Sequence, residues 1–146
     1  MHTVKNTIIS NKEKKILFLG LTVKGKIHDF TLLKSEFYPN INWFEFFKIW
    51  IDLGYLGFEK EYVSKETNIP EKKPRKSKKN PNPKLTAEQK EQNRYISSVR
   101  VFVENAIGGA KRFRILIDIF RAKSYELLDK AIFLAASLWN FKLKFF

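Results

Sequence analysis

Two acidic residues, Asp52 and Glu104, are the side chains of this chain best suited to chemistry. Asp52 ends an apolar, aromatic run over residues 46–51 and is followed by Gly54 and Gly57. Glu104 lies in a later segment with helical spacing. A carboxylate at the end of a strand and another on a helix are two parts of a nuclease-type metal site, because Mg²⁺ prefers carboxylate oxygens. Such a site usually contains a third acid, so the central question is whether this chain has one.

Each acid also has an ordinary structural interpretation. Asp52 can serve as a turn residue before Gly54, since Asp side chains commonly accept hydrogen bonds from nearby backbone amides. Glu104 follows Arg100 by one helical turn and can pair with it on a solvated face of the helix. The residues alone leave both interpretations of Asp52 open, and they favour the ion pair for Glu104.

The chain is strongly basic, with 28 Lys and Arg against 15 Asp and Glu and a formal charge of +13. This excess favours a polyanionic partner, because a basic protein gains affinity for nucleic acid by releasing condensed counterions. Much of the charge lies in a Pro- and Lys-rich loop at about residues 70–84 and in a cluster at residues 111–123. The alternative is that both are solvated segments without a ligand. The candidates for contact with nucleic acid are Lys72, Lys73, Arg75, Lys76, Lys78, Lys79, Arg100, Lys111, Arg112 and Arg114, with Arg121 and Lys123 further along.

Other kinds of site find little support in the residues. The chain has no Cys, which excludes disulfides and zinc–thiolate sites and fits a reducing compartment. His2 and His28 are the only histidines, so a multi-histidine metal site is excluded. His28 and Asp29 are accessory candidates for metal or acid–base work, although a His before a helix-capping Asp is more often structural. The longest apolar stretch, residues 41–51, is too short and too polar for a bilayer span of roughly 20 apolar residues, so we expect a soluble protein without membrane contact.

The order of the predicted elements, strands first and helices later, indicates a mixed α/β domain. Residues 4–10 and 15–23 are β-prone and are expected to pair, with Gly25 ending the second strand. The run over residues 46–51 is ambiguous by periodicity. Its aromatic and β-branched residues favour a buried strand that leads into Asp52.

Three helices are expected. A short one is predicted to begin after Asp29, acting as N-cap, and to end at residues 39–40. A long one is predicted from Thr86, where Thr86 and Gln89 form a capping box. Another is predicted over residues 124–141. The glycines at 108–109 are costly inside a helix, so they are expected either to end it or to let another backbone approach. The predicted core stripes are Ile96, Val99, Val103 and Ile107 on the first long helix, and Leu127, Leu128, Ala131, Ile132, Ala135, Leu138 and Trp139 on the second.

Several motifs occur together in a specific order along the chain. They are Gly25-Lys26-Ile27-His28-Asp29, Asp52-Leu53-Gly54-Tyr55-Leu56-Gly57, residues 85–90, 93–94 and 96–100, and Val103-Glu104-Asn105-Ala106-Ile107-Gly108-Gly109-Ala110-Lys111-Arg112-Phe113. In this order they resemble the C-terminal part of the DDE-type transposases of bacterial insertion sequences, in the branch close to the eukaryotic Harbinger transposases. The resemblance covers most of residues 2–143 and rests on the combination of motifs.

The resemblance implies a ribonuclease H-like fold, with a mixed sheet and flanking helices, and a triad of acids that binds two divalent ions, Mg²⁺ or Mn²⁺. By position, Asp52 matches the second acid and Glu104 the third, so both are expected to be catalytic residues and metal ligands. The resemblance also implies cleavage and transfer of DNA strands. The expected partner is DNA at the ends of an insertion sequence, bound by a cytoplasmic, nucleoid-associated bacterial protein that can act as a homo-oligomer.

The first acid of the family triad lies on a strand upstream of the segment that matches residues 2–6, and here only Met1 precedes that segment. We therefore expect residues 1–146 to form a partial catalytic domain whose sheet lacks its first, central strand. The chain alone is expected to be inactive and marginally stable, and to act only with a separately encoded N-terminal half. The alternative is a non-catalytic, basic DNA-binding remnant.

Overall fold

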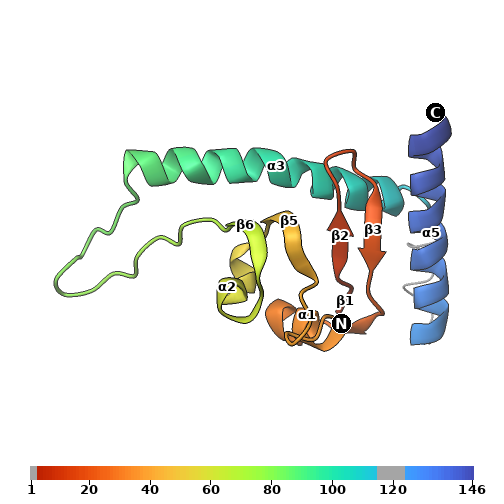
Figure 1. Ribbon diagram of the computed structural model, residues 1–146, viewed down its shortest axis with the longest axis horizontal. Coiled ribbons are helices and arrows are strands. Elements are labelled where there is room, and N and C mark those ends of the chain that lie inside the picture. Colours follow the sequence, from red (N-terminus) through yellow and green to blue (C-terminus); the bar gives the residue numbers. More distant parts are fainter. Residues whose placement is uncertain (1–2, 115–123) are drawn as a thin grey trace. The chain divides into compact units, whose positions relative to one another are not determined.

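The computed structural model describes residues 3–114 and 124–146, which form a mixture of short strands and helices (Figure 1). The chain divides into two compact units, unit 1 with Met1–Glu36 and Val101–Phe146, and unit 2 with Phe37–Arg100. The predicted mixed α/β class is confirmed. The described strands pair as three two-stranded sheets, and the incomplete ribonuclease H-like sheet stays a prediction. None of the helices in the described ranges is long and apolar enough to cross a membrane.

A β-hairpin in unit 1 confirms the predicted strand pair. Strands β2 (Ile8–Ser10) and β3 (Ile16–Leu19) are antiparallel neighbours. Asn11 shapes the turn between them, because its Oδ1 accepts hydrogen bonds from the amides of Glu13 at 3.1 Å and Lys15 at 2.9 Å. The side chain of Asn11 therefore satisfies backbone amides that the strand pairing leaves without a partner.

A second antiparallel pair flanks this hairpin. It consists of β1 (Val4–Lys5) and β4 (Val23–Lys24). As predicted, this second strand ends at Gly25, whose amide donates to the carbonyl oxygen of Thr3 at 2.7 Å. A Cβ at Gly25 would lie 2.8 Å from that oxygen, so only glycine allows the close approach.

Helix α1 (Asp29–Glu36) differs from its prediction at both ends. The helix already includes Asp29, and the group that accepts a hydrogen bond from the Phe30 amide, at 3.3 Å, is Nδ1 of His28. The Asp29 carboxylate instead accepts a hydrogen bond from Nζ of Lys5 at 2.7 Å. Asp29 is therefore not the N-cap, because an ammonium on a neighbouring strand takes its side chain. The helix also ends earlier than predicted, at Glu36.

Helix α3 (Ala87–Lys111) begins as predicted. Oγ1 of Thr86 accepts from the Gln89 amide at 3.2 Å, and Oε1 of Gln89 accepts from the Thr86 amide at 3.0 Å, so the capping box is confirmed. The helix does not end at Gly108-Gly109. What approaches Gly109 is the ring of Trp139 and not another backbone, and a Cβ there would lie 2.4 Å from a ring carbon.

The predicted core stripe of α3 is only partly right. Ile96 is fully buried, whereas Val99, Val103 and Ile107 are half-buried. Ala106 and Ala110 are buried in their place. Small residues occupy these positions because a large ring packs against them.

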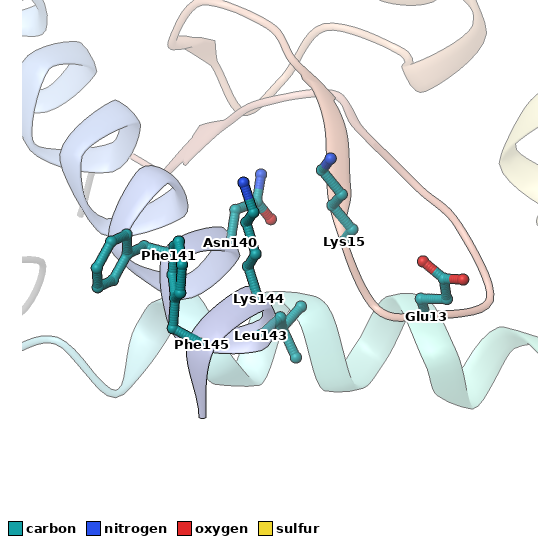
Figure 2. Close-up of a pocket in the computed structure, with 7 residues that line it drawn as sticks. All are labelled: Glu13, Lys15, Asn140, Phe141, Leu143, Lys144 and Phe145. Carbon is teal, nitrogen blue, oxygen red and sulfur yellow. The ribbon is translucent and has the colours of Figure 1, made fainter.

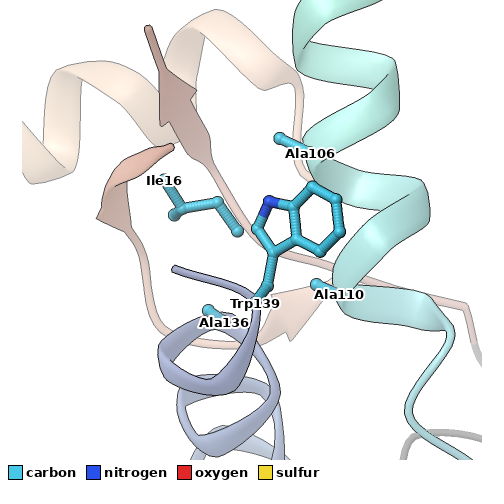
Figure 3. Close-up of a cluster of buried hydrophobic side chains, with 5 residues drawn as sticks. All are labelled: Ile16, Ala106, Ala110, Ala136 and Trp139. Atoms are coloured by element: carbon cyan, nitrogen blue, oxygen red, sulfur yellow. The ribbon is translucent and has the colours of Figure 1, made fainter. Parts of the chain in front are cut away.

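Helix α5 (Tyr125–Phe145) follows an N-cap at Ser124, whose hydroxyl accepts from the Leu127 amide. Its Trp139 packs in a cluster with Ile16, Ala106, Ala110 and Ala136 (Figure 3). The Trp139 indole donates to the carbonyl oxygen of Lys14 at 2.9 Å. The core of unit 1 thus joins the hairpin, the end of α3 and α5.

The side chain of Asn140 attaches α5 to the backbone of β3. Its Oδ1 accepts from the Ile16 amide at 2.9 Å and its Nδ2 donates to the Ile16 carbonyl at 2.8 Å. The side-chain amide thereby pairs with this residue as the backbone of a neighbouring strand would. Asp129 adds a third link by accepting from the Thr22 amide at 2.7 Å.

The predicted apolar face of α5 needs one correction. Leu128, Ala131, Ala135 and Trp139 are buried as expected. Leu127 and Leu138 are exposed, since they lie roughly a quarter turn away on an adjacent side of the helix.

Unit 2 is built around aromatic rings. Phe44, Phe58 and Tyr62 are buried, and the ring centroids of Phe44 and Phe58 are 5.3 Å apart. Strands β5 (Phe44–Trp50) and β6 (Ser64–Asn68) run parallel, and 3₁₀ helix η1 (Leu53–Tyr55) and α2 (Phe58–Glu61) connect them.

The predicted strand before Asp52 is confirmed as β5, but its predicted burial is wrong in the middle. Phe46 is 80% exposed and Phe47 is 58% exposed. The pairing with β6 is irregular between Phe44 and Lys48, so the strand is covered at its start and is partly covered at its end.

The two glycines of α3 allow a matched test of this packing. We predict that Gly109→Ala destabilises the protein by about 1–3 kcal/mol, because its methyl group overpacks the Trp139 ring. Gly108→Ala should stabilise by up to about 1 kcal/mol, since a Cβ there meets nothing within 4 Å and alanine favours the helix. Urea unfolding of both variants checks the opposite signs, and two changes of the same sign would contradict this packing.

Candidate functional site

Asp52 lies at the end of β5, where the strand passes into η1. It is the N-cap of η1, and its Oδ1 accepts a hydrogen bond from the Leu53 amide at 2.7 Å. Its carbonyl oxygen accepts from the Tyr55 amide at 3.0 Å. Asp caps helices well because its side chain satisfies an amide that the helix leaves unpaired. The turn interpretation of Asp52 is therefore confirmed as a local role, and this role leaves part of the carboxylate available for another ligand.

Arg100 is the other partner of Asp52 within unit 2. Its Nη2 lies 3.2 Å from Oδ2 of Asp52, and its Nη1 donates to Oδ1 at 3.4 Å. The Asp52 side chain is 51% exposed and that of Arg100 is 31% exposed. A two-point pair of this kind orients the carboxylate, while solvent keeps its net stabilisation to about 1 kcal/mol or less.

The strand that carries Asp52 is held along its length by β6. The Ile51 amide donates to the Asn68 carbonyl at 3.1 Å. Lys48 and Glu66 face each other across the two strands with a 2.6 Å ion pair. The hydrogen bond and charge of Glu66 raise the pKa of Lys48, and Lys48 in turn lowers the pKa of Glu66. Both side chains remain charged near neutral pH, so this link is present where metal-dependent DNA chemistry would run.

The turn after Asp52 contains one glycine that its backbone requires. Gly57 adopts φ 96°, the left-handed conformation that side chains disfavour, and it is the N-cap of α2. Gly54 lies inside η1 and has no positive φ. The predicted role of the glycine-rich turn is thus confirmed for Gly57 alone.

Glu104 lies on the part of α3 that belongs to unit 1, and it is exposed. Asp52 belongs to unit 2. Both carboxylates are exposed to solvent, that of Asp52 just after a strand and that of Glu104 on a helix. That state suits a metal ligand, because a divalent ion exchanges bound water for carboxylate oxygen.

The accessory candidates His28 and Asp29 have structural partners. Lys5 donates both to Asp29 and to the Ile27 carbonyl at 2.7 Å, which ties the start of α1 to β1. Nδ1 of His28 accepts a hydrogen bond from the Phe30 amide. These contacts give both residues a structural role, and the accessory metal or acid–base role stays a prediction.

Within residues 3–114 and 124–146, no group of three or more His, Cys, Asp or Glu side chains gathers in one place. Asp52 fits a hard divalent ion as a single ligand, because one Oδ already accepts an amide and the half-exposed carboxylate has remaining lone pairs.

The basic candidates are exposed. Residues 69–86 contain neither helix nor strand, and Lys72, Lys73, Arg75, Lys76, Lys78 and Lys79 all lie in this loop and face solvent. We call residues 70–84 the basic loop. Lys111 ends α3, and Arg112 and Arg114 follow it, again exposed. Arg121 and Lys123 lie outside the described residues.

The sequence gives no signal for two long-range contacts of the structure. Asp52 and Arg100 are 48 positions apart, and no local pattern links a strand end to the middle of a later helix. Arg100 was interpreted only as a neighbour of Glu104 and as a phosphate contact. Asn140 was not singled out, because a single Asn on a helix gives no signal of a contact with a distant strand.

Comparison with known proteins assigns the chain to a family. The sequence model of the DDE superfamily endonucleases matches residues 1–140. The chain is also 34% identical, over 143 residues, to a protein of Microchaete diplosiphon described as a probable transposase for insertion sequence element IS702. No solved structure matches the chain.

The chain belongs to the DDE superfamily endonucleases, and the predicted relation to DDE-type transposases is confirmed. Membership implies a ribonuclease H-like fold, a divalent metal and a DNA partner at the level of the family. The matched stretch is 97% of this chain and 47% of the curated relative, so the chain spans about half the length of that protein.

The Arg100 contact leads to a prediction about metal affinity at Asp52. Arg100→Gln removes a positive charge beside the carboxylate, so we expect the affinity of this site for Mn²⁺ to rise about 5- to 10-fold. The measurement is titration with Mn²⁺ followed by electron paramagnetic resonance.

Lys48→Gln is the matched control for this prediction. Lys48 lies on β5, the strand that leads to Asp52, and its ammonium pairs with Glu66. The variant therefore removes a cation that pairs with a different carboxylate. It should change the affinity less than about 2-fold, and Asp52→Asn should abolish the gain in the Arg100 variant. A fall in affinity on removing Arg100 would mean that the guanidinium holds Asp52 in position for the metal.

Proposed function

We propose that Asp52 and Glu104 are two acids of a DDE endonuclease metal site that cleaves and transfers DNA strands. The observation that supports the proposal is the family match over residues 1–140, a stretch that contains both acids. The half-exposed carboxylate of Asp52, fixed at a strand end, supports a ligand role. His28 and Asp29 are left with structural roles.

Two divalent ions, Mg²⁺ or Mn²⁺, would activate the attacking water or 3′-hydroxyl and stabilise the leaving oxygen. Contacts within this chain orient the Asp52 carboxylate. The Leu53 amide holds one oxygen of Asp52 and leaves the other to Arg100 or to a cation. Asp52 and Glu104 would hold the metal, and Arg100, which pairs with Asp52 here, would then contact a phosphate of the DNA backbone.

The resemblance matches only two acids of the triad to residues 1–146, and two ligand carboxylates hold two metals less tightly than three. We propose that the other acid of the triad lies in polypeptide outside residues 1–146, since the matched stretch is 47% of the curated relative. The proposed DNA partner is the end of an insertion sequence, bound by an oligomer of the protein.

The test is nicking of supercoiled DNA that carries insertion-sequence ends, with Mg²⁺ or Mn²⁺. The 146-residue chain is compared with a chimera that adds the part of the curated relative outside the matched stretch. We predict that the chimera nicks and the chain alone does not. Asp52→Ala or Glu104→Ala in the chimera should reduce nicking by more than about 100-fold, because even outer partners of metal ligands are worth up to about that factor.

Glu91→Ala is the control, since Glu91 is an exposed acid on the same helix α3 as Glu104. It should leave nicking unchanged. Nicking by the unextended chain would refute the need for a further acid, and a chimera that nicks equally well without Asp52 or Glu104 would refute their roles.

A second candidate function is DNA binding without cleavage. It is supported by the exposure of the basic loop, which carries no acid from residue 72 to residue 84. Under this function Asp52→Asn and Glu104→Gln leave DNA affinity and its salt dependence unchanged, and no extension of the chain produces nicking. The chimera assay separates the two functions.

A further inference from the structure

A pocket of about 560 Å³ opens in unit 1 between the turn of the β2–β3 hairpin and the C-terminal end of α5 (Figure 2). The turn contributes Glu13 and Lys15, and α5 contributes Phe141, Lys144 and Phe145. None of these residues belongs to the basic loop or to the acids assigned above. We call it the hairpin–α5 pocket.

Two aromatic rings form one wall of this pocket. The ring centroids of Phe141 and Phe145 are 4.6 Å apart with an interplanar angle of 41°. The two side chains are 55% and 57% exposed, although burial of a Phe side chain is worth about 1.5–3 kcal/mol. Exposed rings of this size that line a hollow are suited to a flat apolar partner.

Two lysines, Lys15 and Lys144, line the pocket together with the rings. Nζ of Lys144 lies 5.1 Å from the Phe145 ring centroid, and Lys15 stands on the opposite side, on the hairpin. Lys12, Lys14 and Lys142 neighbour the lining residues in sequence, and Glu13 is the one acid among residues 11–15. A ligand with a planar ring and a negative charge complements this combination.

The two walls of the pocket are fixed to each other. Both hydrogen bonds of the Asn140 side chain go to the backbone of Ile16, and the Trp139 indole binds the carbonyl oxygen of Lys14. The hairpin and the end of α5 therefore form one preformed surface, which reduces the entropy lost when a ligand binds.

We propose that the hairpin–α5 pocket binds unpaired bases of single-stranded DNA, with a base stacked on Phe141 or Phe145 and the adjacent phosphates on Lys15 and Lys144. The ligand is single-stranded because bases inside a duplex stack on one another and present no free face. The inference rests on the proposed function in that it takes DNA as the partner. It adds a site for the strand that cleavage or transfer leaves unpaired.

The test measures the affinity of the full chain for a fluorescent oligothymidine of about ten nucleotides and for a duplex of the same length, by anisotropy. The double variant Phe141→Leu/Phe145→Leu keeps apolar side chains on α5 and removes the rings. We expect it to lose about 10-fold in single-strand affinity and less than 2-fold in duplex affinity. Lys15→Gln/Lys144→Gln should lower the slope of log affinity against log salt by about 1.4.

Phe133→Leu is the matched control, since Phe133 is 41% exposed on the same helix and does not line the pocket. Equal losses in Phe133→Leu and the pocket variant would overturn the proposal, as would unchanged single-strand binding in the pocket variant. Circular dichroism verifies that both variants fold. The proposal would also be overturned if sedimentation showed that the pocket variant converts a dimer to a monomer, because the exposed side of α5 would then contact a second copy.

A variant of the basic loop separates this inference from the proposed function. Lys72→Gln/Lys73→Gln/Lys76→Gln/Lys78→Gln should weaken duplex binding, because it removes phosphate contacts. If the loop variant weakens duplex binding and the Phe141→Leu/Phe145→Leu variant leaves single-strand affinity unchanged, the pocket proposal alone fails. If the wild-type chain binds neither form of DNA, both proposals fail.

Discussion

The contact between the Trp139 ring and the backbone of Gly109 organises unit 1. A side chain at position 109 would collide with the ring, so α3 can pass it only as glycine. The indole also binds the carbonyl oxygen of Lys14, and the next residue, Asn140, pairs with Ile16. One turn of α5 therefore fixes the helix α3, the hairpin and the walls of the hairpin–α5 pocket.

In unit 2, two partners hold the carboxylate of Asp52. Its oxygens are shared between the Leu53 amide and the Arg100 guanidinium, and both are contacts at a half-exposed position. The neutral amide orients the side chain and leaves its negative charge in place. The guanidinium partly neutralises that charge, so Asp52 is a helix cap and an ion-pair partner, and it is also the proposed metal ligand.

Local signals in the sequence predicted local structure well. The capping box at Thr86, the strand before Asp52 and the hairpin around Asn11 form because neighbouring residues satisfy one another's backbone groups. The helix cap at Asp29 was wrong, because Lys5 competes for its carboxylate from a strand far away in sequence. The pairs Asp52–Arg100 and Asn140–Ile16 left no signal, since contacts over 48 and 124 positions depend on the tertiary arrangement. The assignment of Asp52 and Glu104 came from ordered motifs and not from periodicity or charge.

The central claim is that Asp52 and Glu104 bind a divalent metal, and iron-directed cleavage of the polypeptide tests it most directly. Fe²⁺ that replaces Mg²⁺ generates hydroxyl radicals with ascorbate and peroxide, and these cut the backbone near the bound ion. We predict cuts near residues 52 and 104 that Mg²⁺ suppresses and that Asp52→Asn abolishes at both places. Cuts that fall elsewhere, or that persist at residue 104 without Asp52, would contradict a shared metal site.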